Sequence, residues 1–386
     1  MDQCLNSQLY PRIKPIYPVY KLHDGLFRIG AQLGLTKQYR DPENQLWELT
    51  QLMDGLHSIE QIVSEMCMKY HSLTQEDIHN GIRVLDRDGF VEQAQHCKYD
   101  DSESSLYRYS ANVNYFSHYA RLDSSREMLQ DKLLNSKVVL LGLGGGGSAI
   151  FQLLIGLGIN NIIAVDYDLV ERSNLNRQFL YRNRDIGKLK TTVAMEFARE
   201  INPDGNYQFV NKKINSFTDL IPIIEGKDLV ISTIDEPQFL AFRRVNKACI
   251  VAGVPCVFGG VQTTKGRLFS ICPGHSGCFD CLHVYYEKRD PLYSEQLRGF
   301  HDSGFKPPSI AFGPNIFAIC SKIAEEAVRV LTGYLPPISF AHQYEIDFET
   351  GSWSDFNSWP KYPDCPTCGT GETANWPSLS YYRGEL

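Results

Sequence analysis

Residues 142–148, GLGGGGS, follow the apolar run KVVLL directly. Gly142, Gly144 and Gly147 fit the pattern G-x-G-x-x-G, and Asp166 ends the next apolar run nineteen residues after Gly147. Such glycines allow a tight turn and let the backbone approach a pyrophosphate, while the carboxylate binds a ribose. The loop predicts a nucleotide site. By itself it favours NAD, but it also fits a transferase that uses ATP.

Cations that follow Asp166 favour the transferase. Arg177, Lys188 and Lys190 all come shortly after it. Departing pyrophosphate carries several negative charges that positive side chains must balance, whereas hydride transfer has no such need. Asp235 follows another apolar run, DLVIST, so we expect it at the same edge of the sheet, where it could bind Mg²⁺. Any one of these charges alone would fit a surface position better; together they favour nucleotidyl or phosphoryl transfer.

Two Cys-x-x-Cys pairs predict a metal site. They are CFDC, with Cys278 and Cys281, and CPTC, with Cys365 and Cys368, each in a segment rich in Pro and Gly. Four thiolates form a closed tetrahedral zinc site with no position open for substrate, which is a structural role. A redox role is an alternative for either pair alone, but two pairs favour Zn²⁺.

The elements that must hold these residues follow from the alternation of the chain. From residue 137 onward, short apolar runs alternate with helical patterns, which predicts an α/β fold with a doubly wound, mostly parallel sheet. Before it, residues 16–33 alternate around an Asp24-Gly25 turn and predict a hairpin. Ser58 and Thr74 are predicted N-caps of two amphipathic helices, and a strand-like FVEQ follows. We therefore expect a small winged-helix-like α+β domain in residues 1–100 and the nucleotide domain in residues 101–386.

Composition limits the classes of function. The chain has 386 residues, 22% of them charged, and a net charge of −7, which is ordinary for a soluble globular protein. Residues 21–95 hold seven Lys/Arg and twelve Asp/Glu, which disfavours a nucleic-acid partner. No apolar run is long enough to span a membrane, and the first residues do not resemble a signal peptide. We therefore expect a cytoplasmic protein whose cysteines are thiols or metal ligands.

On these motifs, residues 105–370 resemble the ATP-binding core of the E1-like adenylating enzymes, which activate ubiquitin-like and sulfur-carrier proteins. GLGGGGS, DYDLVERSNLNRQ, DIGKLK and STIDEP carry the resemblance. It implies a homodimer in which a carboxylate attacks the α-phosphate of ATP, giving an acyl-adenylate and pyrophosphate. It implies Arg177, Lys190 and Asp235 as catalytic residues. The implied nucleotide and Mg²⁺ ligands are Gly142, Gly144, Gly145, Gly147, Asp166, Asp168, Asn174, Arg177, Lys190 and Asp235.

The chain departs from that family in two places. The family carries a second arginine after RYS that reaches the partner's ATP site, where this chain has Ala111; Arg121 or Arg126 is a candidate replacement. The E1 enzymes that pass their substrate on as a thioester also place a nucleophilic cysteine after the first zinc pair, and residues 282–315 contain none. Cys320 comes later, inside an apolar helical pattern typical of a buried residue. We therefore predict that no covalent enzyme–substrate intermediate forms.

The N-terminal module resembles leader-peptide recognition domains. Together with the core, it makes nearly the whole chain resemble the E1-like enzymes of ribosomal peptide antibiotic maturation, a group that includes the microcin C and pantocin A maturation enzymes. The resemblance implies ATP-dependent activation of a carboxyl or amide of a precursor peptide whose leader binds residues 15–95, followed by cyclisation, dehydration or AMP conjugation. Phe305 and Lys306 would lie in a lid. The alternatives are activation of a sulfur-carrier protein, a non-catalytic leader-binding scaffold, and a purely structural role for the module in dimerisation.

Overall fold

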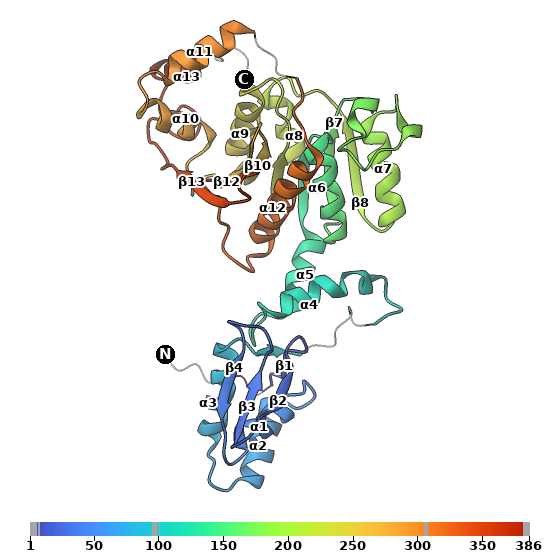
Figure 1. Ribbon diagram of the computed structural model, residues 1–386, viewed down its shortest axis with the longest axis vertical. Coiled ribbons are helices and arrows are strands. Elements are labelled where there is room, and N and C mark those ends of the chain that lie inside the picture. Colours follow the sequence, from blue (N-terminus) through green and yellow to red (C-terminus); the bar gives the residue numbers. More distant parts are fainter. Residues whose placement is uncertain (1–5, 7, 95–98, 100, 305–307, 381–386) are drawn as a thin grey trace. The chain divides into compact units, whose positions relative to one another are not determined.

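The computed structural model describes residues 6, 8–94, 99, 101–304 and 308–380 (Figure 1). The chain divides into two compact units, Met1–Lys132 and Leu133–Leu386. Each is described by itself. None of the helices in the described part of the chain has the length and apolar character that a membrane span requires.

The larger unit is built on one eight-stranded sheet with the order β13-β12-β11-β10-β9-β6-β7-β8. All pairs from β10 to β8 are parallel, and β11, β12 and β13 extend the sheet in antiparallel fashion. The α/β fold with a large, mostly parallel sheet is therefore as predicted, although the antiparallel strands were not foreseen. The strands are β6 (Lys137–Leu141), β7 (Asn161–Asp166), β8 (Asn206–Asn211), β9 (Leu229–Ser232), β10 (Cys256–Val261), β11 (Lys265–Ile271), β12 (His342–Asp347) and β13 (Trp353–Ser358).

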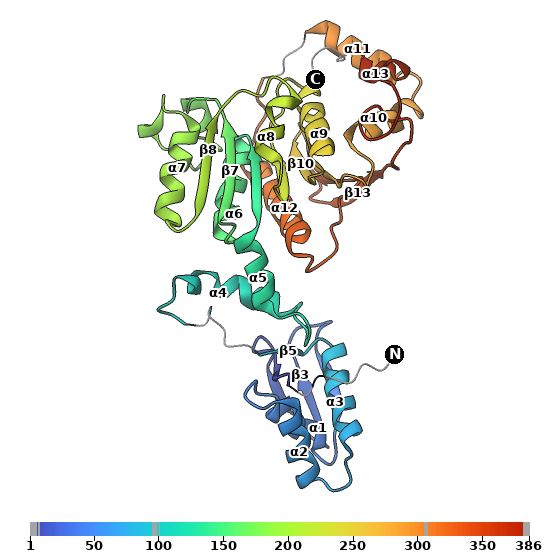
Figure 2. The same cartoon turned by 180° about the vertical axis from the view of Figure 1, so that it is seen from behind.

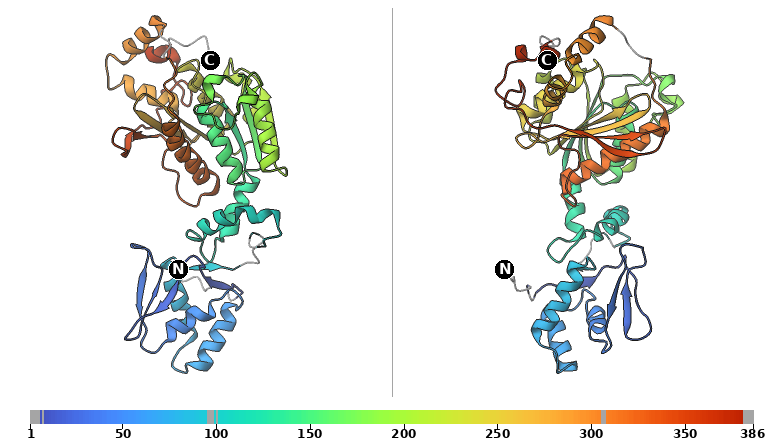
Figure 3. Two further views of the ribbon diagram at one scale, coloured as in Figure 1. Left: turned by 45° about the vertical axis from the view of Figure 1, so that its right-hand side comes forward. Right: turned by 60° about the vertical axis from the view of Figure 1, so that its left-hand side comes forward.

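Helices cover both faces of this sheet (Figures 2 and 3). The central strands β6 and β9 are buried almost throughout, which is why their sequences are continuous apolar runs. Alternate residues of the strands, such as Val139 and Val230, share a core with Val245 and Ala248 of α9. Helix α12 packs instead against α6 and β10. The helices are α6 (Gly145–Gly156), α7 (Lys190–Ile201), α8 (Ile221–Ile224), α9 (Leu240–Ala252), α10 (Phe279–Glu287), α11 (Tyr293–Ser303), α12 (Gly313–Thr332) and α13 (Pro377–Ser380).

The direction of the strand order reverses between β6 and β9. From β6 the chain proceeds through β7 to β8, and it then returns to β9 on the other side of β6. In open α/β sheets, ligands bind outside the carboxyl ends of the strands at such a switch point. The loops that follow β6, β7 and β9 are therefore the place to look for a site.

The smaller unit combines antiparallel strands with helices. Its strands are β1 (Pro11–Ile13), β2 (Val19–Lys21), β3 (Leu26–Ile29), β4 (Lys37–Arg40) and β5 (Val91–Gln93); β2, β3 and β4 form one sheet, and β1 pairs with β5. Its helices are α1 (Gln45–Leu52), α2 (Ile59–Lys69), α3 (Gln75–Arg87), α4 (Ser110–Ser117) and α5 (Arg126–Asn135), whose last residues enter the larger unit. The predicted hairpin and the predicted N-caps Ser58 and Thr74 are confirmed. The winged-helix assignment stays a prediction.

The division between the units lies at residues 132 and 133, whereas the sequence suggested residues 100 and 101. Buried polar contacts explain why α4 belongs with the smaller unit. Lys14 is fully buried and donates to the backbone oxygen of His118 at 2.9 Å. Ser117 donates to buried Glu92 at 2.6 Å, and these contacts tie the segment after residue 100 to β1 and β5.

Candidate functional site

Two glycines shape the loop between β6 and α6. Gly142 has a φ of 93°, a left-handed conformation that suits glycine. A Cβ built at Gly147 would lie 1.9 Å from the carbonyl oxygen of Gly142, so only glycine lets α6 start this close to the strand. A Cβ at Gly144, the N-cap of α6, would meet no protein atom within 4 Å. The backbone at Gly144 is therefore open, and the helix N-terminus beside it favours a phosphate.

Asp166, the last residue of β7, is tied to this loop. Its Oδ2 accepts from the backbone N–H of Leu143 at 2.6 Å, and its Oδ1 accepts from that of Asp168 at 2.8 Å. Burial raises the pKa of the Asp166 carboxyl, and the nearby Lys190 partly offsets that rise. Tyr181 donates its hydroxyl to the carbonyl of Leu143 at 2.7 Å from the opposite side. Sequence reasoning missed Tyr181, which lies in a segment without apolar periodicity.

Lys190 reaches the same place from the start of α7. It is 5% exposed, and its Nζ lies 2.8 Å from Oδ2 of Asp168. Lys188, the neighbouring candidate, is exposed and pairs with Asp185 at 2.9 Å. The structure thus brings Asp166, Asp168 and Lys190 together and directs Lys188 elsewhere.

Arg177 lies over the start of α6. A Cβ at Gly145 would lie 3.6 Å from Cδ and Nε of Arg177, and the guanidinium donates to the backbone oxygen of Ser173 at 2.8 Å. Asn174 is buried, and its Oδ1 accepts from the backbone N–H of Glu171 at 3.0 Å. Asn174 therefore shapes the turn that carries Arg177, and Arg177 adds a positive charge beside the open glycine loop.

Asp235 follows β9 at the same edge of the sheet. Thr233, two residues earlier, donates to the carbonyl of Leu141, which joins this loop to the glycine loop. Desolvation by the surrounding protein raises the pKa of the Asp235 carboxyl, with Glu236 a smaller cause, although the residue itself is exposed. Within the described part of the chain, the Asp235 carboxylate forms no ion pair. An unpaired carboxylate near a phosphate site fits a Mg²⁺ ligand.

The four paired cysteines meet in space. Their thiols all lie within 4.8 Å of one another, with Cys278 and Cys365 at 3.6 Å and Cys281 and Cys368 at 3.3 Å. Zn–S bonds of ~2.3 Å in a tetrahedron place sulfurs about 3.8 Å apart. These thiols therefore have the number, type and spacing to hold Zn²⁺.

A buried ion pair joins the two cysteine pairs to the sheet. Asp280, between Cys278 and Cys281, accepts two hydrogen bonds from Arg243 of α9, at 2.9 and 3.0 Å. Thr367, between the other two cysteines, donates to the same carboxylate at 2.7 Å. The sequence analysis did not identify Arg243 or Asp280, because nothing local shows that two residues 37 positions apart will meet.

The remaining candidates are engaged elsewhere. Cys320 is 1% exposed, and burial raises the pKa of its thiol to about 12, so it does not supply a thiolate. Arg126 is 2% exposed and lies beside Glu127, with 3.0 Å between Nε and Oε1. Arg121 donates to the backbone oxygen of Asp86 at 2.5 Å. Both arginines are therefore used inside the smaller unit. Phe305 and Lys306 lie outside the described residues.

Residues 115–367 match the ThiF family, which is well over half of the chain. The chain belongs to the ThiF family. The match covers the glycine loop, the cations after it, Asp235 and three of the four paired cysteines, and it ends one residue before Cys368. It leaves residues 1–114 outside the family, and these form most of the smaller unit.

Relatives agree on the enzyme class of the ThiF core. The SAMP-activating enzyme E1 of Haloferax volcanii is 27% identical over 272 residues, which are 70% of this chain and 94% of that protein. The sulfur carrier protein ThiS adenylyltransferase of Escherichia coli is 27% identical over 241 residues, 62% of this chain and 88% of that protein. Several longer relatives are matched over about half of their length.

The fold of nearly the whole chain also occurs in a solved structure. Escherichia coli MccB, crystallised with AMPCPP and selenomethionine MccA, matches with a TM-score of 0.72 and 24% identity, covering 93% of this chain and 99% of MccB. At this identity the likeness concerns the fold. The family match, the relatives named as adenylyltransferases and this shared fold together show that this ThiF protein is an ATP-dependent adenylyltransferase.

Proposed function

We propose that this ThiF-family enzyme adenylates a carboxyl or amide group of a short, ribosomally made precursor peptide, whose leader binds the smaller unit. The observation that carries the proposal is the additional unit. The ThiF match starts at residue 115, and the two relatives described above align with 70% of the chain or less. An enzyme that recognises its substrate only at the nucleotide site has no need for such a unit.

The smaller unit has the features of a peptide-binding domain. Among the described strands, β4 lies at an edge of its sheet and pairs with β3 alone, so its other side can add an extended peptide. The segment 21–95 carries twelve acidic and seven basic residues, which suits a peptide and disfavours a nucleic acid. The crystal structure of MccB with MccA supports a peptide partner for a protein of this fold.

At the nucleotide site, we assign roles from position and charge. The open backbone at Gly144 and the N-terminus of α6 would receive the phosphates of ATP, and Arg177 and Lys190 would balance the charge of the leaving pyrophosphate. Asp235 would hold Mg²⁺, which neutralises phosphate oxygens. The substrate oxygen attacks the α-phosphorus of ATP, and the bond between that phosphorus and the pyrophosphate oxygen breaks. An acyl-adenylate or its amide counterpart forms.

We further propose that the activated group is captured without a bond to the enzyme. Cys320 is buried with a raised thiol pKa, and the four clustered cysteines would be saturated by Zn²⁺. A nucleophile of the peptide itself would then displace AMP and close a ring, and because the activated oxygen leaves in AMP, the peptide loses the elements of water overall. As in related enzymes, we expect a homodimer in the cytoplasm.

The test begins with a search for a short open reading frame beside the gene of this enzyme. The encoded peptide, synthesised and incubated with enzyme, ATP and Mg²⁺, should lose 18 Da per modified site or gain an AMP mass, and the leader alone should compete. A peptide that stays unchanged while labelled pyrophosphate fails to exchange into ATP would contradict the proposal.

The second candidate is activation of a small sulfur-carrier protein, favoured by the match to 94% of the Haloferax volcanii E1 enzyme. It predicts that a carrier ending in Gly-Gly supports pyrophosphate exchange. It also predicts that the isolated leader peptide leaves that exchange unchanged, whereas the peptide proposal predicts that the leader competes with the precursor.

A further inference from the structure

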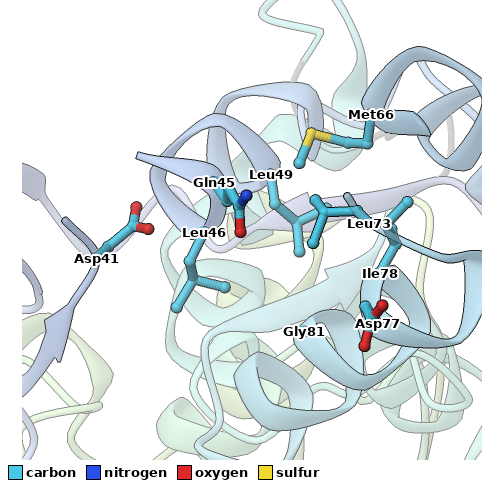
Figure 4. A pocket seen from close by; sticks show the side chains of 9 residues that line it. All are labelled: Asp41, Gln45, Leu46, Leu49, Met66, Leu73, Asp77, Ile78 and Gly81. Atoms are coloured by element: carbon cyan, nitrogen blue, oxygen red, sulfur yellow. The ribbon is translucent and has the colours of Figure 1, made fainter. Parts of the chain in front are cut away.

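The smaller unit contains a cavity of about 160 Å³ on its helical side (Figure 4). It lies among α1, α2 and α3 and beside the end of β4. An engineered apolar cavity of ~150 Å³ takes up a benzene molecule, so a cavity of this size accepts one medium-sized apolar side chain. The lining residues are Asp41, Gln45, Leu46, Leu49, Met66, Leu73, Asp77, Ile78 and Gly81.

The floor of the cavity is apolar, and its mouth is accessible. Leu49, Met66 and Ile78 are at most 3% exposed, whereas Leu46 and Leu73 are half-buried. The missing side chain of Gly81 helps to keep the space open: a Cβ there would lie 2.7 Å from Cδ2 of Leu49. The cavity is therefore a pocket that a side chain can enter from solvent.

The two charged residues that line the pocket are both acidic: Asp77 is exposed at the mouth, whereas Asp41 is buried. Figure 4 shows Asp41 and Asp77 on either side of the apolar residues. Each has an oxygen engaged in the unit: Asp41 accepts from the backbone N–H of Trp47 at 2.7 Å, and Asp77 accepts from that of Thr74 at 2.9 Å. Hydrogen bonds from Thr74 also lower the pKa of the Asp77 carboxyl, so it is ionised at neutral pH. Exposed Asp77 therefore gives the mouth a negative charge, and no lysine or arginine is among the described residues that line the pocket.

We propose that this pocket binds one apolar side chain, of the size of Leu or Met, from the precursor peptide, at a position next to a positive charge. The choice of a peptide as occupant rests on the proposed function; the apolar-plus-cation chemistry rests on the pocket alone. Burial of such a side chain corresponds to a gain of about 10- to 100-fold in affinity. Pairing with the edge of β4 contributes affinity for any sequence, so the pocket selects the sequence.

The test uses full-length enzyme with ¹³C-methyl methionine, because Met66 forms part of the floor. Its signal is assigned with Met66→Leu. The probes are four heptapeptides: LKGSGSG, LEGSGSG, SKGSGSG and N-acetylated LKGSGSG. We expect LKGSGSG to shift the Met66 signal with a dissociation constant at least tenfold lower than LEGSGSG or SKGSGSG. Weaker binding after acetylation would identify the terminal ammonium as the recognised cation, and unchanged binding would identify the lysine.

Matched variants locate the binding. Leu46→Trp fills the mouth and should weaken LKGSGSG at least tenfold, whereas Leu56→Trp, at a position 79% exposed and outside the pocket, should not. If Leu46→Trp fails to fold, Asp77→Asn against Glu76→Gln tests the charge in the same way. Equal binding of LKGSGSG, LEGSGSG and SKGSGSG, or unchanged binding by both pocket variants, would overturn the proposal.

The outcomes also separate this inference from the proposed function. If a precursor supports pyrophosphate exchange without shifting the Met66 signal, the pocket proposal is wrong and the proposed function stands. If a precursor shifts the Met66 signal but is never adenylated, the pocket proposal stands and the proposed function is wrong.

Discussion

Arg243 and Asp280 form a bidentate ion pair in which each side chain is 1% exposed. The pair connects α9, which starts just after the Asp235 loop, to the first cysteine pair. A third guanidinium nitrogen donates to the backbone oxygen of Leu379 at 3.0 Å, so the same arginine also holds the C-terminal helix α13. One residue thereby holds three distant parts of the chain.

Removing one partner of this pair should destabilise the enzyme strongly. Asp280→Asn leaves the Arg243 charge buried without its counterion, which costs about 3–5 kcal/mol. Denaturant unfolding of the purified protein measures the loss. The control is Glu48→Gln, whose partner Lys69 is 54% exposed and whose loss should cost less than about 1 kcal/mol. Equal losses for both variants would show that the buried pair contributes no special stability.

The glycine loop gives a prediction that separates folding from binding. In Gly147→Ala the new methyl group meets the Gly142 carbonyl. We therefore expect the free energy of unfolding to fall by about 1–3 kcal/mol or more, which is the cost of overpacking. In Gly144→Ala the methyl group has free space, so the melting temperature should stay the same. ATP binding by calorimetry should nevertheless weaken at least tenfold. Unchanged ATP affinity in Gly144→Ala would place the phosphates elsewhere.

Asp235→Asn should lower pyrophosphate exchange by about 100-fold or more, the scale of losing one key electrostatic group in a transition state. Glu236→Gln, the adjacent carboxylate, is the control and should keep most of the activity. The raised pKa of Asp235 also predicts a pH effect, since only the ionised carboxylate binds Mg²⁺. Activity at limiting Mg²⁺ should fall as the pH drops toward that raised pKa, at a higher pH than for an ordinary aspartate with a pKa of ~3.9. If the fall of activity at low pH persists in Asp235→Asn, the titrating group is another residue.

Lys190 and Lys188 lie two positions apart but should differ sharply. Lys190→Met removes the buried cation beside Asp168 and should lower the exchange rate about 100-fold. Lys188→Met removes an exposed cation and should change the rate less than about threefold, as expected for a surface ion pair worth under ~1 kcal/mol. Circular dichroism checks that both variants fold. Similar rates for the two would remove Lys190 from the reaction.

The four clustered cysteines should hold one zinc ion for each chain. Elemental analysis of enzyme purified without chelator tests this, and Cys365→Ser should lose the metal and melt at a lower temperature, because the ion joins segments 87 residues apart. Cys272→Ser, a half-buried cysteine outside the cluster, is the control. Metal-free wild-type enzyme with an unchanged melting temperature would contradict a structural zinc site.

Local sequence signals predicted much of the architecture. The N-caps Ser58 and Thr74 predicted where α2 and α3 begin, since a cap involves residues only three positions apart. Continuous apolar runs predicted the buried parallel strands for a similar reason. Helix α1 escaped prediction because its N-cap, Asn44, is left-handed and makes no side-chain capping bond. Strands β11 to β13 also escaped, since their pairing is decided by neighbours far along the chain.

For the candidate site, the sequence by itself determined which residue types are present: the glycine loop, the cations, Asp235 and two cysteine pairs. Only the tertiary structure decided that Lys190 lies against Asp168 while Lys188 points to Asp185, and that Arg121 and Arg126 are used inside the smaller unit. It also decided that Arg243 meets Asp280, and that a pocket opens beside Gly81. The reason is physical: spacing along the chain determines the face of a strand or helix, but contacts between distant residues depend on how the elements pack.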